Sequence, residues 1–330
     1  MSTNNRYREI DELKAIGIFF IILVHSIQQT ARTSFSAKLA NISQFAVPVF
    51  VFCSCLLYAK ISGKYASSTL IYVARRVWRL LKPYYIFLIF YLPLTGVLTL
   101  KSIDIKHAIS LLLVWAPTNE PDWAVLLFIY VSCLTLLARY LYHRARPVFW
   151  LYVAAAIASA GFLLQHTYPF GFRSIMWLSW SLVVLFGFFV KKYEDRRWLY
   201  PVILIIPAIV FFGSYLILNQ AGQPLSFYAN KYPPNLYFLS YGVLASAVFY
   251  IASRVGFFSI IPRQIVAFFS INSYSIYFVH FVLILFFVKY GNIKIFSWWQ
   301  FFFVIITLTV VVQLGINSTI KVAFNRKRVY

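Results

Sequence analysis

The chain has 330 residues, of which 62% are hydrophobic, 20% are aromatic and only 12% are charged. Its mean hydropathy of +0.77 reflects more apolar surface than a soluble core needs, which excludes an ordinary soluble globular protein. A net charge of +22 would suit a nucleic-acid binder, but the distribution of that charge along the chain argues against this class. Apolar runs of about 20 residues recur along the whole length, which is typical of transmembrane helices.

These runs predict an all-α integral membrane protein, a bundle of about ten transmembrane helices. The expected spans are 13–31, 40–59, 80–100, 123–142, 147–166, 173–190, 199–219, 236–253, 265–288 and 296–320. The apolar segment Ala108–Ala116 is too short to cross a bilayer, so we expect an interfacial or re-entrant piece there. Because the outer loops are short, residues 1–330 are expected to form a single polytopic membrane domain.

Basic residues follow the positive-inside pattern. With the N-terminus placed in the cytoplasm, 22 of the 30 Lys and Arg residues fall on the inner side and 8 on the outer side. This split predicts that both the N-terminus and the C-terminus are cytoplasmic. Attraction to anionic lipid accounts for most of the positive charge, so membrane lipids are expected partners and nucleic acid is not.

The first span carries a basic residue and a histidine eleven positions apart, Lys14 and His25. Eleven residues make three helical turns plus about 20°, so both side chains share one helix face, about 16 Å apart along the axis. Ionisable groups inside a bilayer are costly and rare, which makes this pair a functional-site hypothesis. Asp11 lies three residues before Lys14 and is placed to pair with it.

A run of arginines precedes the third span, within the segment Tyr72–Tyr85. Arg75, Arg76 and Arg79 would hold this segment inside and contact lipid phosphates, which composition alone favours. The alternative is that they bind a phosphorylated ligand from the cytoplasm, because a guanidinium group can bind phosphate through two hydrogen bonds.

The ninth span contains a second membrane histidine, His280, with Ser273 and Tyr277 on its side of the helix. The first and ninth spans both run outward, and both histidines are expected about 18 Å into the core, slightly past its middle. Two histidines at equal depth predict one shared cavity. The alternative is that each imidazole only hydrogen-bonds a neighbouring helix.

Cysteine usage points to neither a metal centre nor a disulfide framework. Cys53, Cys55 and Cys133 all fall within predicted spans and show no metal-ligand spacing. We therefore expect no metal.

The motifs together resemble those of acyltransferase family 3, integral-membrane enzymes that O-acylate sugars and other extracytoplasmic acceptors. The stretches that carry the resemblance are the basic-x10-His pattern of Lys14 and His25, VPVFVFCSCLLYAK (Val47–Lys60), ARRVWRLLKPYY (Ala74–Tyr85), NKYPPNLYFLSYG (Asn230–Gly242) and NSYSIYFVH (Asn272–His280). Each motif is loose, but their order and spacing are fairly specific and span the whole chain.

Two departures from the family pattern bear on the site. The second span has Ser54-Cys55 where the family has Ser-Gly, so helix packing around Ser54 is expected to differ. Only half of the family's Trp-Phe pair in the fourth span is present, as Trp123-Ala124.

The resemblance implies that acyl-CoA, with acetyl-CoA the default, donates an acyl group from the cytoplasmic side of the bacterial cytoplasmic (inner) membrane. The acceptor would be a hydroxyl of an extracytoplasmic polysaccharide or lipid-linked sugar. The expected ligands of the CoA phosphates are Lys14, Arg75, Arg76 and Arg79. His25 would act as general base or acyl carrier, while His280 and Tyr277 orient the acceptor or the oxyanion. Candidate supporting residues are Asp11, Ser54, Trp123 and Ser273.

Two other classes stay open at this point. A transporter or flippase of a glycan or lipid-linked sugar would also need ten spans and buried polar groups. Such folds often show inverted repeats and paired broken spans, and the sequence shows neither. A structural subunit of a polysaccharide machine would tolerate replacement of both membrane histidines.

Overall fold

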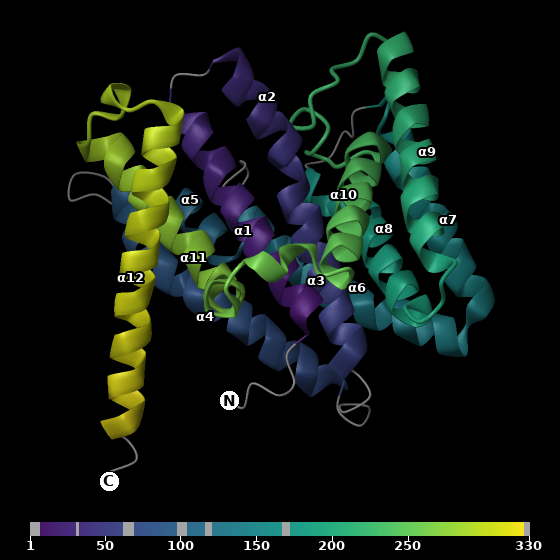
Figure 1. Cartoon of the computed structure of the whole chain (residues 1–330), viewed down its shortest axis with the longest axis horizontal. Helices are drawn as coiled ribbons and strands as arrows, with labels where there is room; N and C mark the ends of the chain where they lie inside the picture. Colours follow the sequence, from purple (N-terminus) through teal and green to yellow (C-terminus); the bar gives the residue numbers. More distant parts are fainter. Residues whose placement is uncertain are drawn as a thin grey trace.

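The computed structural model describes residues 7–30, 33–61, 69–97, 104–115, 121–166 and 172–326, and within these ranges the regular structure is helical, without β-strands. The α-helices are α1 (Arg8–Gln29), α2 (Ser34–Ile42), α3 (Ala46–Ile61), α4 (Thr69–Thr95), α5 (Ile105–Leu112), α6 (Asp122–Arg144), α7 (Arg146–Phe162), α8 (Phe172–Tyr193), α9 (Leu199–Gln220), α10 (Leu236–Arg254), α11 (Arg263–Tyr290) and α12 (Trp298–Arg326). A short 3-10 turn, η2 (Ser43–Phe45), joins α2 to α3, and Figure 1 shows the arrangement.

Seven helical segments of the described chain are long and apolar enough to cross a membrane. They are Ser34–Ala59, Asp122–Arg144, Arg173–Tyr193, Leu199–Gln220, Leu236–Arg254, Arg263–Tyr290 and Trp298–Val322. The other three expected spans correspond to α1, α4 and α7. Helix α7 has only 17 residues, and α1 and α4 carry several charged side chains in their N-terminal halves. The structure thus supports an integral multi-pass membrane protein, and the count of ten spans stays a prediction.

The outer helices present apolar faces to their surroundings. In α9 only 22% of the apolar stretch is buried within the protein, and in α12 only 28%. The exposed apolar side chains of α9 include Ile205, Ile206, Ile209, Phe212 and Leu216. Soluble monomers rarely expose such contiguous apolar surface, so lipid is the solvent that these faces require.

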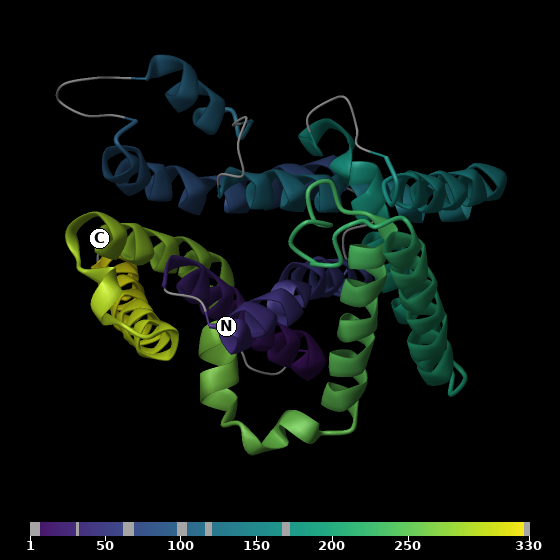
Figure 2. The same ribbon diagram turned by 90° about the horizontal axis from the view of Figure 1, so that it is seen from above.

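Helix α1 lies at the centre of the bundle. It packs against α11 and α12 on one side and against α3 and α10 on the other, as Figure 2 shows. Leu13, Ile18, Ile22 and Ile27 are completely buried along its length. Because neighbours surround most of its length, a buried polar side chain of α1 can find a hydrogen-bond partner only inside the protein.

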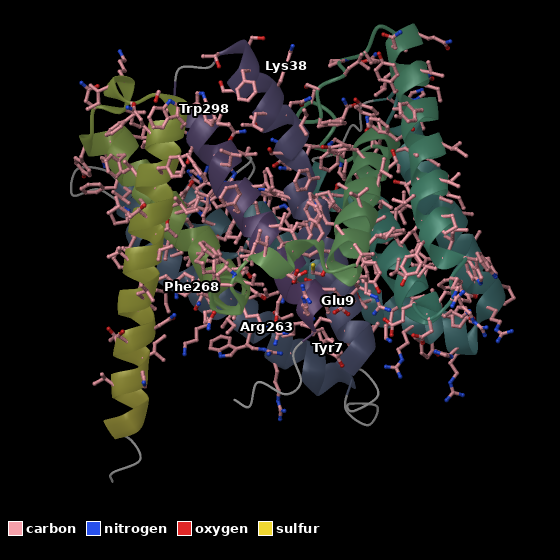
Figure 3. The ribbon with its side chains drawn as sticks, in the orientation of Figure 1. Tyr7, Glu9, Lys38, Arg263, Phe268 and Trp298 are labelled. Atoms are coloured by element: carbon pink, nitrogen blue, oxygen red, sulfur yellow. The ribbon has the colours of Figure 1, made fainter. Side chains whose placement is uncertain are left out.

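Helices α1 and α11 run in the same direction. Figure 3 places Tyr7 and Glu9, where α1 begins, on the same side of the bundle as Arg263, where α11 begins. Lys38 and Trp298 lie on the opposite side. Helix α12 starts at Trp298 and ends on the side of Tyr7. The N-terminal end of α1 and the C-terminal end of α12 therefore lie on the same side of the bundle (Figure 1).

Helix α3 approaches α8 and α10 closely at glycines of these neighbours. A Cβ atom added to Gly187 of α8 would lie 2.8 Å from the Cβ of Cys55, and one added to Gly242 of α10 would overlap the Pro48 side chain. The cysteine that replaces the family's glycine is therefore accommodated because α8 supplies a glycine opposite to it.

We expect Gly242→Ala to destabilise the protein by about 1–3 kcal/mol, because the added methyl group overpacks the contact with Pro48. The measurement is thermal unfolding in detergent micelles. Gly213→Ala in α9 is the matched control, since no atom lies within 4 Å of its added methyl group. Equal melting temperatures of the two variants would contradict the close approach of α3 and α10.

Candidate active site

Two histidines from α1 and α11 meet inside the bundle. The Nδ1 atom of His25 lies 2.9 Å from the Nε2 atom of His280. The two ring planes are inclined by only 4° and their centroids are 5.2 Å apart. This geometry fits a hydrogen bond in the plane of the rings, because rings stacked face to face could not bring two nitrogens so close. The two histidines meet at the depth predicted for them, but neither lines the cavity described below, so a shared cavity stays a prediction.

The carbonyl group of Ile276 determines where the imidazole protons lie. It stands 2.9 Å from Nδ1 of His280, and a carbonyl oxygen only accepts, so this nitrogen carries the proton and donates it. The Nε2 atom of neutral His280 then accepts a hydrogen bond from Nδ1 of His25. The Nε2 atom of His25 keeps its lone pair, which can serve as a base or a nucleophile.

The two histidines differ in accessibility. His280 is completely buried, whereas His25 is half-buried. His25 is therefore the member of the pair that a substrate can reach, and His280 holds it in one tautomer.

A cavity of about 320 Å³ leads toward the histidine pair between α1, α3, α4, α6 and α11. Its lining includes six of the residues singled out in the sequence: Lys14, Ser54, Arg76, Arg79, Ser273 and Tyr277. Ile21 also lines it and precedes His25 by one helical turn. The Tyr277 ring contacts the ring of His280 at a centroid distance of 5.7 Å. The cavity thus runs from a basic region to within one helical turn of His25.

The basic region of the cavity is a candidate phosphate site. Lys14, Arg76 and Arg79 contribute the positive charge, and the lining contains no Asp or Glu among the described residues. Arg75 is exposed and does not line the cavity, because successive helical residues point about 100° apart. The structure therefore does not group Arg75 with the other two arginines. In the described part of the chain, no group of three or more His, Cys, Asp or Glu side chains could hold a metal ion.

Two carboxylates fix the orientation of α1 near its start. The Asp11 carboxylate accepts a hydrogen bond of 2.6 Å from the Ser270 hydroxyl of α11. The Glu12 carboxylate accepts one of 2.6 Å from the Ser253 hydroxyl of α10. Together they set the rotation of α1 about its axis, which determines the direction in which His25 points. Sequence inspection had singled out Asp11 but not its serine partner.

A lysine that is not among the predicted site residues is buried in the loop between α9 and α10. Lys231, in the loop 221–235 between α9 and α10, donates a hydrogen bond of 3.1 Å to the Gln44 side-chain oxygen. Its ammonium group stands 5.1 Å from the ring centroid of Trp123 and 5.2 Å from that of Tyr232. Burial lowers the pKa of Lys231 to about 7. Lys231 also interacts electrostatically with His25.

The sequence contained one signal for Lys231. It lies within the NKYPPN stretch, where prolines and flanking asparagines indicate a constrained turn. Lys231 is one of the eight basic residues predicted on the outer side. Its charge alone does not indicate whether the side chain is buried or solvated.

Trp123 is positioned by a buried ion pair between α6 and α8. The Arg173 guanidinium contacts both oxygens of Asp122, at 2.7 and 2.9 Å, and both side chains are buried. The Tyr277 hydroxyl donates a 3.3 Å hydrogen bond to the carbonyl group of Pro121. This hydrogen bond joins α11 to the residue before α6, two positions before Trp123.

We expect Asp122→Ala to cost about 3–5 kcal/mol of unfolding free energy, because it leaves the buried Arg173 guanidinium without its carboxylate. Denaturant unfolding in micelles measures this. The double variant Asp122→Leu with Arg173→Met should recover most of the loss, since it removes both charges. A single variant as stable as the parent protein would refute a structural role for the pair.

Comparison with known proteins gives one family match. The sequence model of the family described as "Acyltransferase domain" matches residues 7–316 of the 330. The matched region contains both histidines, the cavity and the Lys231 loop. Comparison with curated proteins and with solved structures gives no match.

Proposed function

The chain belongs to acyltransferase family 3, and we propose that it moves an acyl group, by default acetyl, from acyl-CoA to a hydroxyl of an extracytoplasmic polysaccharide or lipid-linked sugar. The family and the seven apolar helical segments support the coarser statement, a membrane acyltransferase. One observation carries the finer proposal: the cavity connects a cluster of cations to the neighbourhood of a histidine that can act as a base.

The basic region of the cavity would bind the donor, acyl-CoA. Lys14 lies in the second turn of α1, close to the side of the bundle on which that helix begins. With both termini in the cytoplasm of a bacterial cell, this region would face the compartment that contains acyl-CoA. Lys14 and His25 are about 16 Å apart along the helix axis. The long pantetheine arm of CoA would follow the cavity and bring the thioester toward His25.

The acyl-transfer step would depend on the tautomers of the two histidines. Nε2 of His25 would accept the proton of the acceptor hydroxyl as its oxygen attacks the thioester carbonyl carbon. A C–O bond forms, the C–S bond breaks, and the proton passes from His25 to the leaving thiolate. His280 accepts a hydrogen bond from His25 throughout and stabilises the imidazolium that forms.

The test of the function is acyl transfer by His25→Ala. This variant should insert normally and still bind acetyl-CoA, because alanine suits both helix and lipid and the basic region is unchanged. Transfer should fall by roughly 10²–10⁴-fold, as expected for the loss of a positioned general base. The measurement is the mass of surface glycans from cells that contain the parent protein, the variant or neither.

His280→Ala should also reduce transfer, because the tautomer of His25 would no longer be fixed. Val255→Ala, a substitution at an exposed position after α10, is the control that should leave the glycan masses unchanged. If well-inserted His25→Ala modified glycans at the parental rate, acyl transfer by this site would be wrong. A change in the amount of surface glycan without a change in its mass would favour the transporter alternative.

The donor site has its own prediction. Arg76→Glu and Arg79→Glu should weaken the binding of CoA, since each charge-assisted phosphate contact contributes roughly 1.5–3 kcal/mol. Titration of CoA into the purified protein in nanodiscs measures the affinity. Arg75→Glu is the matched control, because Arg75 comes from the same helix but lies outside the cavity. The same affinity in all three variants would leave the arginines with a topological role alone.

A further inference from the structure

The loop that contains Lys231 is closed by its own side chains. The Asn230 amide donates to the carbonyl groups of Pro224 and Ser226, at 2.7 and 2.8 Å. The Asn235 amide donates to the side-chain oxygen of Asn230 at 2.5 Å, and its own oxygen caps the start of α10 at Phe238. The turn therefore has a definite shape that depends on both asparagines, and this shape directs Lys231 into the protein.

The loop is also attached to the C-terminal turn of α2. The backbone N–H of Phe227 donates to the Asn41 side chain at 2.7 Å, and the Phe227 ring stacks on Tyr241 at 3.9 Å. The Tyr241 hydroxyl donates to the carbonyl group of Ile42 at 2.5 Å. Figure 1 shows this loop at the same end of the bundle as α2. Lys231 is thus held at the end opposite to the one where α1 begins.

The Lys231 ammonium group is incompletely satisfied by the protein. The Gln44 amide nitrogen faces the Ala40 carbonyl group at 3.2 Å, so its oxygen faces Lys231 and accepts one of the three ammonium protons. The ammonium group also faces the rings of Trp123 and Tyr232, which attract a cation but do not neutralise it. In the described part of the chain no carboxylate forms an ion pair with Lys231.

A buried cation without a counter-charge destabilises a folded protein, and a methionine of similar length would fill the same space at lower cost. Lys231 is only 8% exposed and interacts electrostatically with His25. A positive charge held in this way is useful when a negative charge appears beside it during the reaction, because in a site shielded from water it acts at nearly full strength.

We infer that Lys231 is a catalytic residue whose ammonium group stabilises the oxyanion formed on the thioester carbonyl oxygen. This inference rests on the proposed acyl transfer. As the acceptor oxygen bonds to the carbonyl carbon, the π electrons of the carbonyl group move onto its oxygen, beside Lys231. When the C–S bond breaks, those electrons re-form the carbonyl group of the ester, and the thiolate takes the proton held by His25.

The experiment uses inverted membrane vesicles that contain the full chain, with radiolabelled acetyl-CoA added outside and incorporation into enclosed glycans followed. Lys231→Met should lower kcat by about 10²–10³-fold, the usual effect of losing an oxyanion donor, and change KM for acetyl-CoA by less than about threefold. Lys231→Arg should have a kcat at least about tenfold higher than that of Lys231→Met, since it returns the positive charge. Lys38→Met is the matched control, an exposed lysine on the same side of the bundle (Figure 3), and should transfer at the parental rate.

Thermal unfolding separates catalysis from structure. Lys231→Met should melt at or above the temperature of the parent protein, because it removes a buried charge. The inference is overturned if Lys231→Met transfers at the parental rate, or if it melts lower and Lys231→Arg restores nothing. Absence of transfer by the parent protein itself would overturn the proposed function instead, which makes the two failures distinguishable.

Discussion

The site depends on one constraint: helix α1 is polar at both ends of a buried, apolar stretch, and its buried polar groups can find partners only within the protein. Asp11 meets Ser270 and Glu12 meets Ser253 near the start of the helix, and His25 meets His280 near its end. Rotation of α1 by a single residue, about 100°, would break these contacts together. The rotation that satisfies them also turns Lys14 into the cavity.

The two charged regions of the site approach the histidine pair from opposite ends of the bundle. Arg76 and Arg79 line the cavity from the side where α1 begins, whereas Lys231 enters with the loop between α9 and α10. The cavity ends within one helical turn of His25, and Lys231 interacts electrostatically with His25. Such an arrangement suits a reaction in which donor and acceptor occupy different compartments, because each substrate can bind without crossing the bilayer.

Sequence periodicity was sufficient to predict that His25 and His280 meet. It was insufficient to predict the charged contacts around them. The spacing of Lys14 and His25 places both side chains on one helix face. The equal depth of His25 and His280 in their two spans predicted that these two histidines meet. The pairing of Asp122 with Arg173 could not be predicted, because the two residues are 51 positions apart and each resembles an ordinary interfacial charge. Arg75 was grouped with Arg76 for a similar reason, since a local run of arginines does not say which side chain reaches a cavity.

In the proposed reaction, the two sets of cations meet counter-charges that exist at different times, and this matches their different environments. The phosphates of CoA are charged in solution, so the arginines proposed to bind them can stay partly exposed, as Arg79 is, and would lose little hydration on binding. An oxyanion exists only during the reaction, and a cation in water would be too well screened to favour it. Lys231 is buried and held by Gln44 between two aromatic rings, which keeps its ammonium group in place before the charge appears. Burial costs hydration energy for a residue that only binds a ligand. For a residue proposed to stabilise a transition state, the same burial strengthens its electrostatic interaction with the developing charge.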